Sequence, residues 1–118
     1  MIRVLVVDGD TESRTRTTEF ITQSLRCQAR GAVDVEQALH FLRRDTFSHA
    51  ILARETLGIR DLIAELQRNH PGVKRVLSGS GPTTLQDAAG WECHGFVEHP
   101  LTQEALRSAL GMPPLSAV

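Results

Sequence analysis

The chain alternates between short apolar runs and longer segments in which apolar residues recur every three or four positions. The apolar runs, which predict strands, cover residues 2–7, 27–33 (a weak one), 48–53, 73–77 and 94–98. The periodic segments, which predict helices, cover residues 10–25, 35–44, 59–69, 83–91 (short and poor) and 102–110. Five such pairs predict an α/β fold, a doubly wound, five-stranded parallel sheet between two helical layers, as in flavodoxin.

Polar residues at the expected helix starts support this assignment. Asp10 or Thr11 can cap the first helix, and Thr102 the last. Asp34 and Gln37 stand at the spacing of a capping box before the second.

The 118 residues suffice for one domain, which we place at residues 1–111, with 112–118 as a linker or frayed tail. A net charge of −1 gives no electrostatic case for nucleic acid or an anionic membrane. No apolar run is long enough to span a membrane, and no signal-peptide pattern is present. Cys27 and Cys93 form no CxxC motif, which favours a reduced, cytoplasmic chain.

Polar residues follow four of the predicted strands, at the sheet edge where doubly wound folds gather their functional groups. The residues at this edge are Asp8, Gly9 and Asp10; Ala53, Arg54 and Glu55; Ser78 and Gly79; and His99 and Pro100.

These positions lie in short motifs: VLVVDGD at 4–10, EQAL at 36–39, FSHAILA at 47–53, VLSG at 76–79 and GFVEHP at 95–100. Together, and in register over nearly the whole chain, they resemble the receiver domain of two-component response regulators. The resemblance implies an acidic pair that holds Mg²⁺ and an aspartate that takes a phosphoryl group from a histidine kinase. It also implies a hydroxyl and a lysine that bind the phosphoryl group and relay the change.

Two departures from the family pattern remove this chemistry. The phosphoacceptor position is Ala53, and alanine has no oxygen to carry a phosphoryl group. Gly9 stands where the second metal-binding acid is expected, so that Asp8 remains alone. We therefore expect no cofactor, and weak or absent Mg²⁺ binding.

A third departure places His99 at the lysine position. Ser78 and Pro100 keep the family identities, and Phe96 occupies the aromatic switch position. Two interpretations of His99 stay open: an ion pair with Asp8, or a half-exposed histidine without an ion pair before a cis-proline.

Two further acids border the predicted pocket. Asp10 is expected to cap the first helix and Glu55 to be a solvated loop acid. The alternative is a receiver phosphorylated at a non-standard residue such as Glu55 or Ser78.

The resemblance implies a pseudo-receiver, a non-enzymatic module of phosphorelay signalling that acts by phosphorylation-independent protein–protein interaction, with a homodimer possible. The family's usual contact face comprises the fourth helix, fifth strand and fifth helix. Its candidate residues here are Trp91, Phe96, Leu101 and Leu106. Trp91 is either a partly exposed anchor or a core residue.

A different class of function is also open. VVDGDT at 6–11 resembles the first motif of haloacid dehalogenase phosphatases, with Asp8 as nucleophile and Asp10 as general acid/base, but their later acidic motif is missing. Cys93, His94 and His99 lack metal-site spacing, so we expect no metal centre there.

Overall fold

The sheet has five strands, and every neighbouring pair is parallel. The computed structural model describes residues 2–80 and 85–113, and for residues 85–87 it describes the main chain alone. The strands are β1 (Arg3–Val7), β2 (Gln28–Ala32), β3 (His49–Ala53), β4 (Lys74–Ser80) and β5 (Gly95–His99). Their order is β2-β1-β3-β4-β5, which confirms the predicted doubly wound fold.

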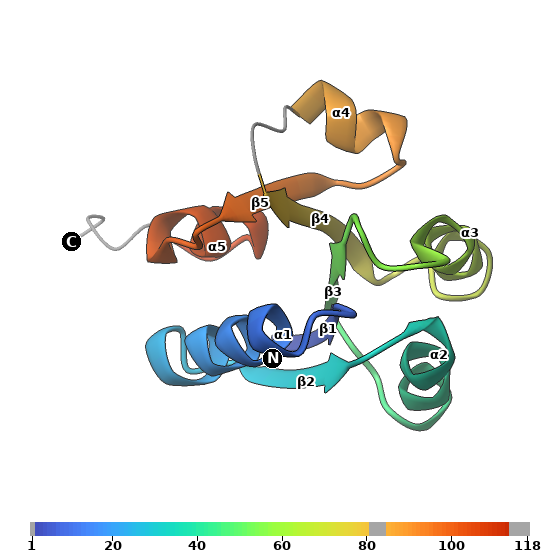
Figure 1. Cartoon of the computed structure of the whole chain (residues 1–118), viewed down its shortest axis with the longest axis horizontal. Coiled ribbons are helices and arrows are strands. Elements are labelled where there is room, and N and C mark those ends of the chain that lie inside the picture. Colours follow the sequence, from blue (N-terminus) through green and yellow to red (C-terminus); the bar gives the residue numbers. More distant parts are fainter. Residues whose placement is uncertain (1, 81–84, 114–118) are drawn as a thin grey trace.

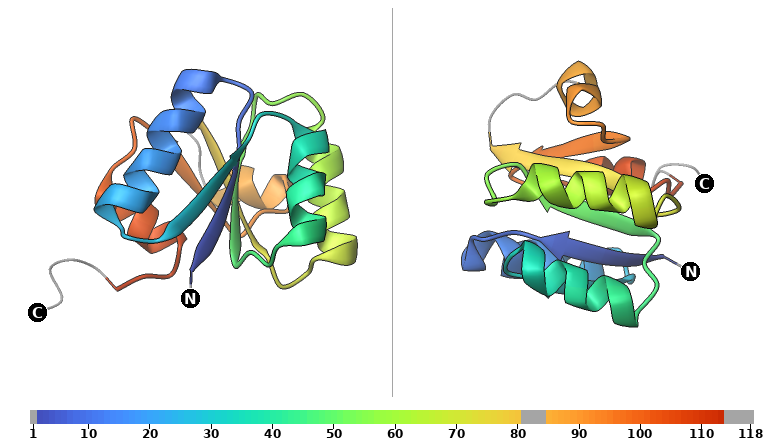
Figure 2. Two further views of the ribbon diagram at one scale, coloured as in Figure 1. Left: turned by 90° about the horizontal axis from the view of Figure 1, so that it is seen from below. Right: turned by 90° about the vertical axis from the view of Figure 1, so that its right-hand side faces the viewer.

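Helices cover both faces of this sheet. They are α1 (Thr11–Glu19), continued by the π-helical turn η1 (Phe20–Ser24), α2 (Val35–Arg44), α3 (Ile59–Asn69), α4 (Leu85–Gly90) and α5 (Gln103–Ala109). Figure 1 shows α1 and α5 on one side and α2 and α3 on the other, and Figure 2 shows the same layers in two further views. The three-layer arrangement is therefore as expected from the sequence.

Three predicted caps are present. The Asp10 carboxylate accepts the Glu12 N–H at 3.2 Å. At α2, Asp34 accepts the Gln37 N–H at 2.8 Å, and at α5 Thr102 accepts the Ala105 N–H at 3.1 Å. Each bond satisfies one of the donors that the first turn of a helix leaves without a partner.

The sheet separates two hydrophobic clusters. In β1, Leu5 and Val7 face the cluster that includes α2, α3 and Ala88 of α4, whereas Val4 and Val6 face the cluster that includes η1 and α5. Full burial of one such side chain stabilises the fold by about 1.5–3 kcal/mol. Because β1 and β3 are buried on both faces, the ends of these strands are held firmly.

The first helical segment differs locally from the prediction. The helical residues are 11–24 where 10–25 were predicted, with Asp10 and Leu25 as the capping residues, and the last part is the π-helical turn η1. The Thr22 hydroxyl donates to the Thr18 carbonyl at 3.0 Å. Such a bond competes with the main-chain N–H for this carbonyl and widens or bends the helix.

β4 is longer than the sequence indicated. The prediction ended this strand at residue 77 and treated 78–82 as a loop, which is wrong for the first three positions. The strand continues because Ser78, Gly79 and Ser80 pair with β5. The remaining loop residues, 81 and 82, and the first two residues of the predicted helix 83–91 lie outside the described part.

The carboxyl-terminal end continues packing beyond residue 111. The Met112 N–H donates to the Arg107 carbonyl at 2.8 Å, and the Met112 side chain packs against the cluster beneath α5. Residues 114–118 of the predicted tail lie outside the described residues. Within residues 2–80 and 85–113, none of the helices has the length and apolarity needed to cross a bilayer.

Candidate functional site

A polar cavity of about 690 Å³ lies at the carboxyl ends of the strands. Its lining residues are Asp8, Gly9, Asp10, Glu12, Ser13, Arg16, Ala53, Glu55, Thr56, Ser80 and His99. Six positions singled out in the sequence therefore meet here: 8, 9, 10, 53, 55 and 99. Ser78, Phe96 and Pro100 are not among the lining residues.

Asp8 is the buried acid of this cavity, with 7% of its surface exposed. Its Oδ1 accepts the Asp10 N–H at 2.9 Å, and its main-chain carbonyl accepts a bond from the Arg14 guanidinium at 2.9 Å. Among the described residues, its second carboxylate oxygen has no hydrogen-bond or ion-pair partner. Asp8 thus presents a negative charge with unused acceptor capacity.

Gly9 links two loops through its main chain. Its N–H donates to Thr56 Oγ1 at 3.1 Å, which joins the loop after β1 to the loop after β3. A Cβ atom at this position would meet the Val33 carbonyl at 3.7 Å and Thr56 Oγ1 at 3.9 Å, both ordinary contacts. A side chain therefore fits at position 9, and the glycine is not imposed by lack of space.

Ala53 is the last residue of β3 and pairs with Ser78 of β4. It is 5% exposed and lines the cavity. The position at which the resemblance places a phosphoacceptor therefore presents a methyl group to the site.

His99 is half-buried at the end of β5 and lines the same cavity. No ion pair joins it to Asp8 among the ion pairs of the described side chains. The peptide bond between His99 and Pro100 is cis. These observations match the second interpretation, a histidine without an ion pair before a cis-proline.

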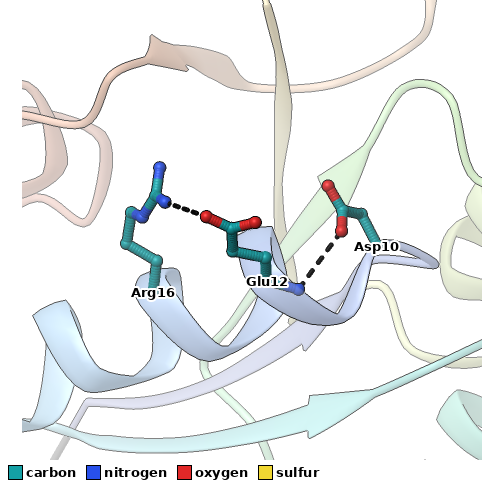
Figure 3. A network of polar contacts seen from close by, with 3 residues as sticks. All are labelled: Asp10, Glu12 and Arg16. Atoms are coloured by element: carbon teal, nitrogen blue, oxygen red, sulfur yellow. Dashed lines mark hydrogen bonds and ion pairs between the residues drawn. The ribbon is translucent and has the colours of Figure 1, made fainter.

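Asp10 and Glu55 hold the roles expected of them as ordinary surface acids. Asp10 caps α1 beside the ion pair in which Arg16 meets Glu12 at 2.6 Å (Figure 3). The Glu55 side chain is 65% exposed and lies 3.8 Å from Arg54 Nε. Both acids also border the cavity, so they add negative potential to it.

The serine that reaches the cavity is Ser80. Ser78 is 4% exposed, whereas Ser80, two residues later in β4, is exposed at the rim. The Arg54 guanidinium donates to the Ser80 carbonyl at 2.9 Å. It also lies about 3.2 Å from the place where a Gly79 side chain would begin. Side chains two positions apart in a strand lie on the same face, so Ser80 could be predicted from Ser78 once β4 is known to extend to residue 80.

Sequence reasoning missed five lining residues: Glu12, Ser13, Arg16, Thr56 and Ser80. The first three share one end of a helix that starts at the crevice, so their helical spacing carried a usable signal. Thr56 carried none, because its role depends on a contact between residues 47 positions apart.

The predicted contact face needs one correction. Leu106 is fully buried beneath α5, so it is a core residue and not a surface candidate. Phe96 and Leu101 are half-buried. Trp91 is also half-buried, packing against the core on one side while Arg60 covers its ring on the other. Trp91 is therefore intermediate between the partly exposed anchor and the core residue of the two interpretations.

The cysteine and histidine cluster after α4 is not arranged for a metal. Burial raises the pKa of the Cys93 thiol to about 11. Nδ1 of His94 is occupied as acceptor of the Arg75 N–H at 3.0 Å. Over residues 2–80 and 85–113, no three side chains of His, Cys, Asp or Glu gather closely enough to hold a metal ion.

No model of a known protein family matches the sequence. Solved structures nevertheless share the fold. The response regulator protein TrrA of Thermotoga maritima, in complex with Mg²⁺-BeF, is similar with a TM-score of 0.79 and 21% identity, over 94% of this chain and 97% of that chain. The chemotaxis response regulator CheY4 of Vibrio cholerae gives 0.77 and 17%, over 94% and 97%. A putative pilus assembly-related protein of Burkholderia pseudomallei gives 0.77 and 23%, over 94% and 87%. At these identities the likeness establishes that the chain has the fold of receiver domains.

Proposed function

We propose that this chain is an atypical receiver domain of two-component signalling that acts by binding a protein partner, without being phosphorylated. The observation that carries the proposal is Ala53 at the end of β3, inside a cavity lined by other groups of the crevice. Phosphoryl transfer to a side chain needs a nucleophilic oxygen, and a methyl group supplies none. Signalling then depends on surface recognition, and the chain has no enzymatic role.

The cation site of an active receiver is also incomplete. Mg²⁺ is held by one or two carboxylates together with phosphate oxygens and water. Here Asp8 stands without a second acid at position 9 or 53. We expect Mg²⁺ binding to be weak or absent, and we place the protein in the reducing cytoplasm.

The proposed contact surface is the face formed by α4, β5 and α5. β5 is an edge strand of the sheet, and a groove of about 600 Å³ runs between it and α5. Phe96, Pro100 and Ala105 contribute apolar groups to this groove, and Thr102 contributes a hydroxyl. Such a mixed, concave surface suits a protein segment, either from a different protein or from a second copy of this chain.

The absence of phosphorylation can be tested with the unmodified protein. Incubation with acetyl phosphate or beryllofluoride and Mg²⁺ should leave the intact mass and the amide NMR shifts around the cavity unchanged. The gain of one phosphoryl group, or saturable shifts with beryllofluoride, would contradict the proposal and locate the acceptor.

A restoring double variant tests the alignment of residues itself. Gly9→Asp combined with Ala53→Asp should bind Mg²⁺ in an NMR titration, because a Cβ at position 9 meets only ordinary contacts. The matched control is Gly9→Asn with Ala53→Asn, which has the same shape without the charges. If the acidic double variant binds Mg²⁺ no better than this control, the assignment of these two positions is wrong.

A further inference from the structure

The cavity holds more negative than positive charge. Four acids line it, of which Glu12 is paired with Arg16 and Glu55 with Arg54. Asp8 and Asp10 have no ionic partner among the described residues. Two uncompensated carboxylates therefore face a common space.

Asp8 makes this imbalance costly. It is 7% exposed, and only one of its carboxylate oxygens accepts a hydrogen bond. A carboxylate withdrawn from bulk water without an ionic partner loses part of its hydration. A cation that entered the cavity would restore this lost interaction and gain a desolvated, charge-assisted bond.

The shape of the cavity selects the kind of cation. No three described acids converge closely enough for a metal ion, and the volume of about 690 Å³ is far larger than one ion needs. Besides Asp8, the acceptors are spread around the wall: the Asp10 carboxylate and the hydroxyls of Thr56 and Ser80. A guanidinium group has five donors in a fixed plane and matches several separated acceptors better than a compact ammonium group does.

We propose that this cavity receives the guanidinium group of an arginine presented by a protein partner, with Asp8 as its buried anion. The small side chains at positions 9 and 53 leave the room that the aliphatic stem needs. The inference rests on the proposed function only for the partner being a protein, since the cavity's preference for a guanidinium group can be measured alone.

The probe is a short blocked peptide, acetyl-Gly-Arg-Gly-amide, titrated into the ¹⁵N-labelled chain of 118 residues. We expect saturable shifts of the Gly9, Asp10, Ala53 and Thr56 amides. The citrulline peptide, which has nearly the same shape and no charge, should cause none, and the lysine peptide should bind several-fold more weakly. Equal effects of the arginine and citrulline peptides, or of the arginine and lysine peptides, would overturn the proposal. So would saturation of the same amides by MgCl₂ at matched ionic strength.

Two variants assign the binding to the acids of the cavity. Asp8→Asn should weaken peptide binding about tenfold or more, because it removes the buried charge. Asp10→Asn should weaken it to a smaller extent while keeping α1 capped, since asparagine caps as well as aspartate. The second variant keeps the test decisive if the first does not fold. The control, Asp45→Asn, removes a carboxylate that contacts Arg3 outside the cavity, and should leave binding unchanged.

The outcome is distinguishable from that of the phosphorylation tests. If the chain is not phosphorylated and also does not bind the arginine peptide, only the inference of a guanidinium site is contradicted. A chain that becomes phosphorylated contradicts the proposed function, whatever the peptide does.

Discussion

The guanidinium carbon of Arg60 lies 3.7 Å from the centre of the Trp91 ring. Arg60 belongs to α3, and Trp91 follows the last residue of α4. Close by, the Gln67 side-chain amide of α3 donates a hydrogen bond to the Glu92 carboxylate. The two contacts fasten the segment after α4 to α3. The two helices stand apart in Figure 1, with α4 above β4 and β5 and α3 at the right of the view.

Arg60→Ala should loosen this attachment. A cation–π contact at a partly exposed site contributes about 0.5–1 kcal/mol. We expect a loss of unfolding free energy of that order in urea, together with a red-shifted and more readily quenched emission of Trp91, the only tryptophan. Arg68→Ala, on an exposed part of the same helix, should change neither emission property. An unshifted emission in Arg60→Ala would show that the contact does not hold the ring.

Thr56→Val should weaken the link between the two crevice loops. The valine keeps the shape of threonine but cannot accept the Gly9 N–H, and one such hydrogen bond contributes about 0.5–1.5 kcal/mol. Amide hydrogen exchange at Gly9 should accelerate, and the urea midpoint should fall. Thr46→Val, at an exposed position between α2 and β3, is the matched control and should leave both quantities unchanged. Unchanged exchange at Gly9 would refute the link.

Stability should depend on pH through His94. Partial desolvation and the neighbouring Arg75 guanidinium lower the pKa of the largely exposed His94, so its neutral ring, which accepts the Arg75 N–H, is favoured in the folded chain. The unfolded chain therefore takes up the proton first, near the ordinary pKa of about 6.5. The unfolding free energy should be level above about pH 7.5, fall as the pH drops through 6.5, and level off again below the folded pKa.

The contribution of His94 can be separated from that of His49, whose pKa is also lowered by burial and by Lys74. His94→Asn retains an acceptor for the Arg75 N–H without a titrating ring. It should reduce the slope of unfolding free energy against pH between about pH 5 and 7. His40→Asn, at an exposed site on α2, is the comparison. Equal slopes in the wild type and His94→Asn would exclude His94 as a contributor.

The two thiols should differ in reactivity. Cys93 is buried with its pKa raised to about 11, so little thiolate is present near pH 8. Cys27 is half-buried. In iodoacetamide at pH 8, Cys27 should be alkylated first, as judged by peptide mass mapping, and Cys27→Ser should abolish the fast phase. Alkylation of Cys93 at the rate of Cys27 would contradict its burial.

The sequence indicated the scaffold because local signals agreed with one another. The run ending at Val7 is buried on both faces, and Asp10, Asp34 and Thr102 cap the helices where the pattern placed them. These features depend on residues close together in the chain. Since the carboxyl ends of parallel strands share one edge of the sheet, the predicted strand ends placed Asp8 and Ala53 at the same edge.

The remaining features depend on contacts between distant residues. The last residues of β4 pair because β5 lies beside them, and nothing in the glycine-rich sequence of that stretch signals it. Leu106 followed the helical pattern, yet its burial is decided by how α5 packs on the sheet. The ring of Trp91 is covered by a residue 31 positions earlier, which no local pattern announces. Side-chain partners of this kind become visible only with the assembled fold.

Because the sheet divides the interior into two clusters, consecutive residues of one strand pack against different helices. A change at Leu5 disturbs the packing of α2 and α3, while a change at Val6 disturbs that of η1 and α5. Binding of a ligand at the crevice, where both helical layers end, can therefore shift the packing on either face of the sheet separately. Substitutions at neighbouring positions in β1 can alter the packing on one face and leave the other face unchanged.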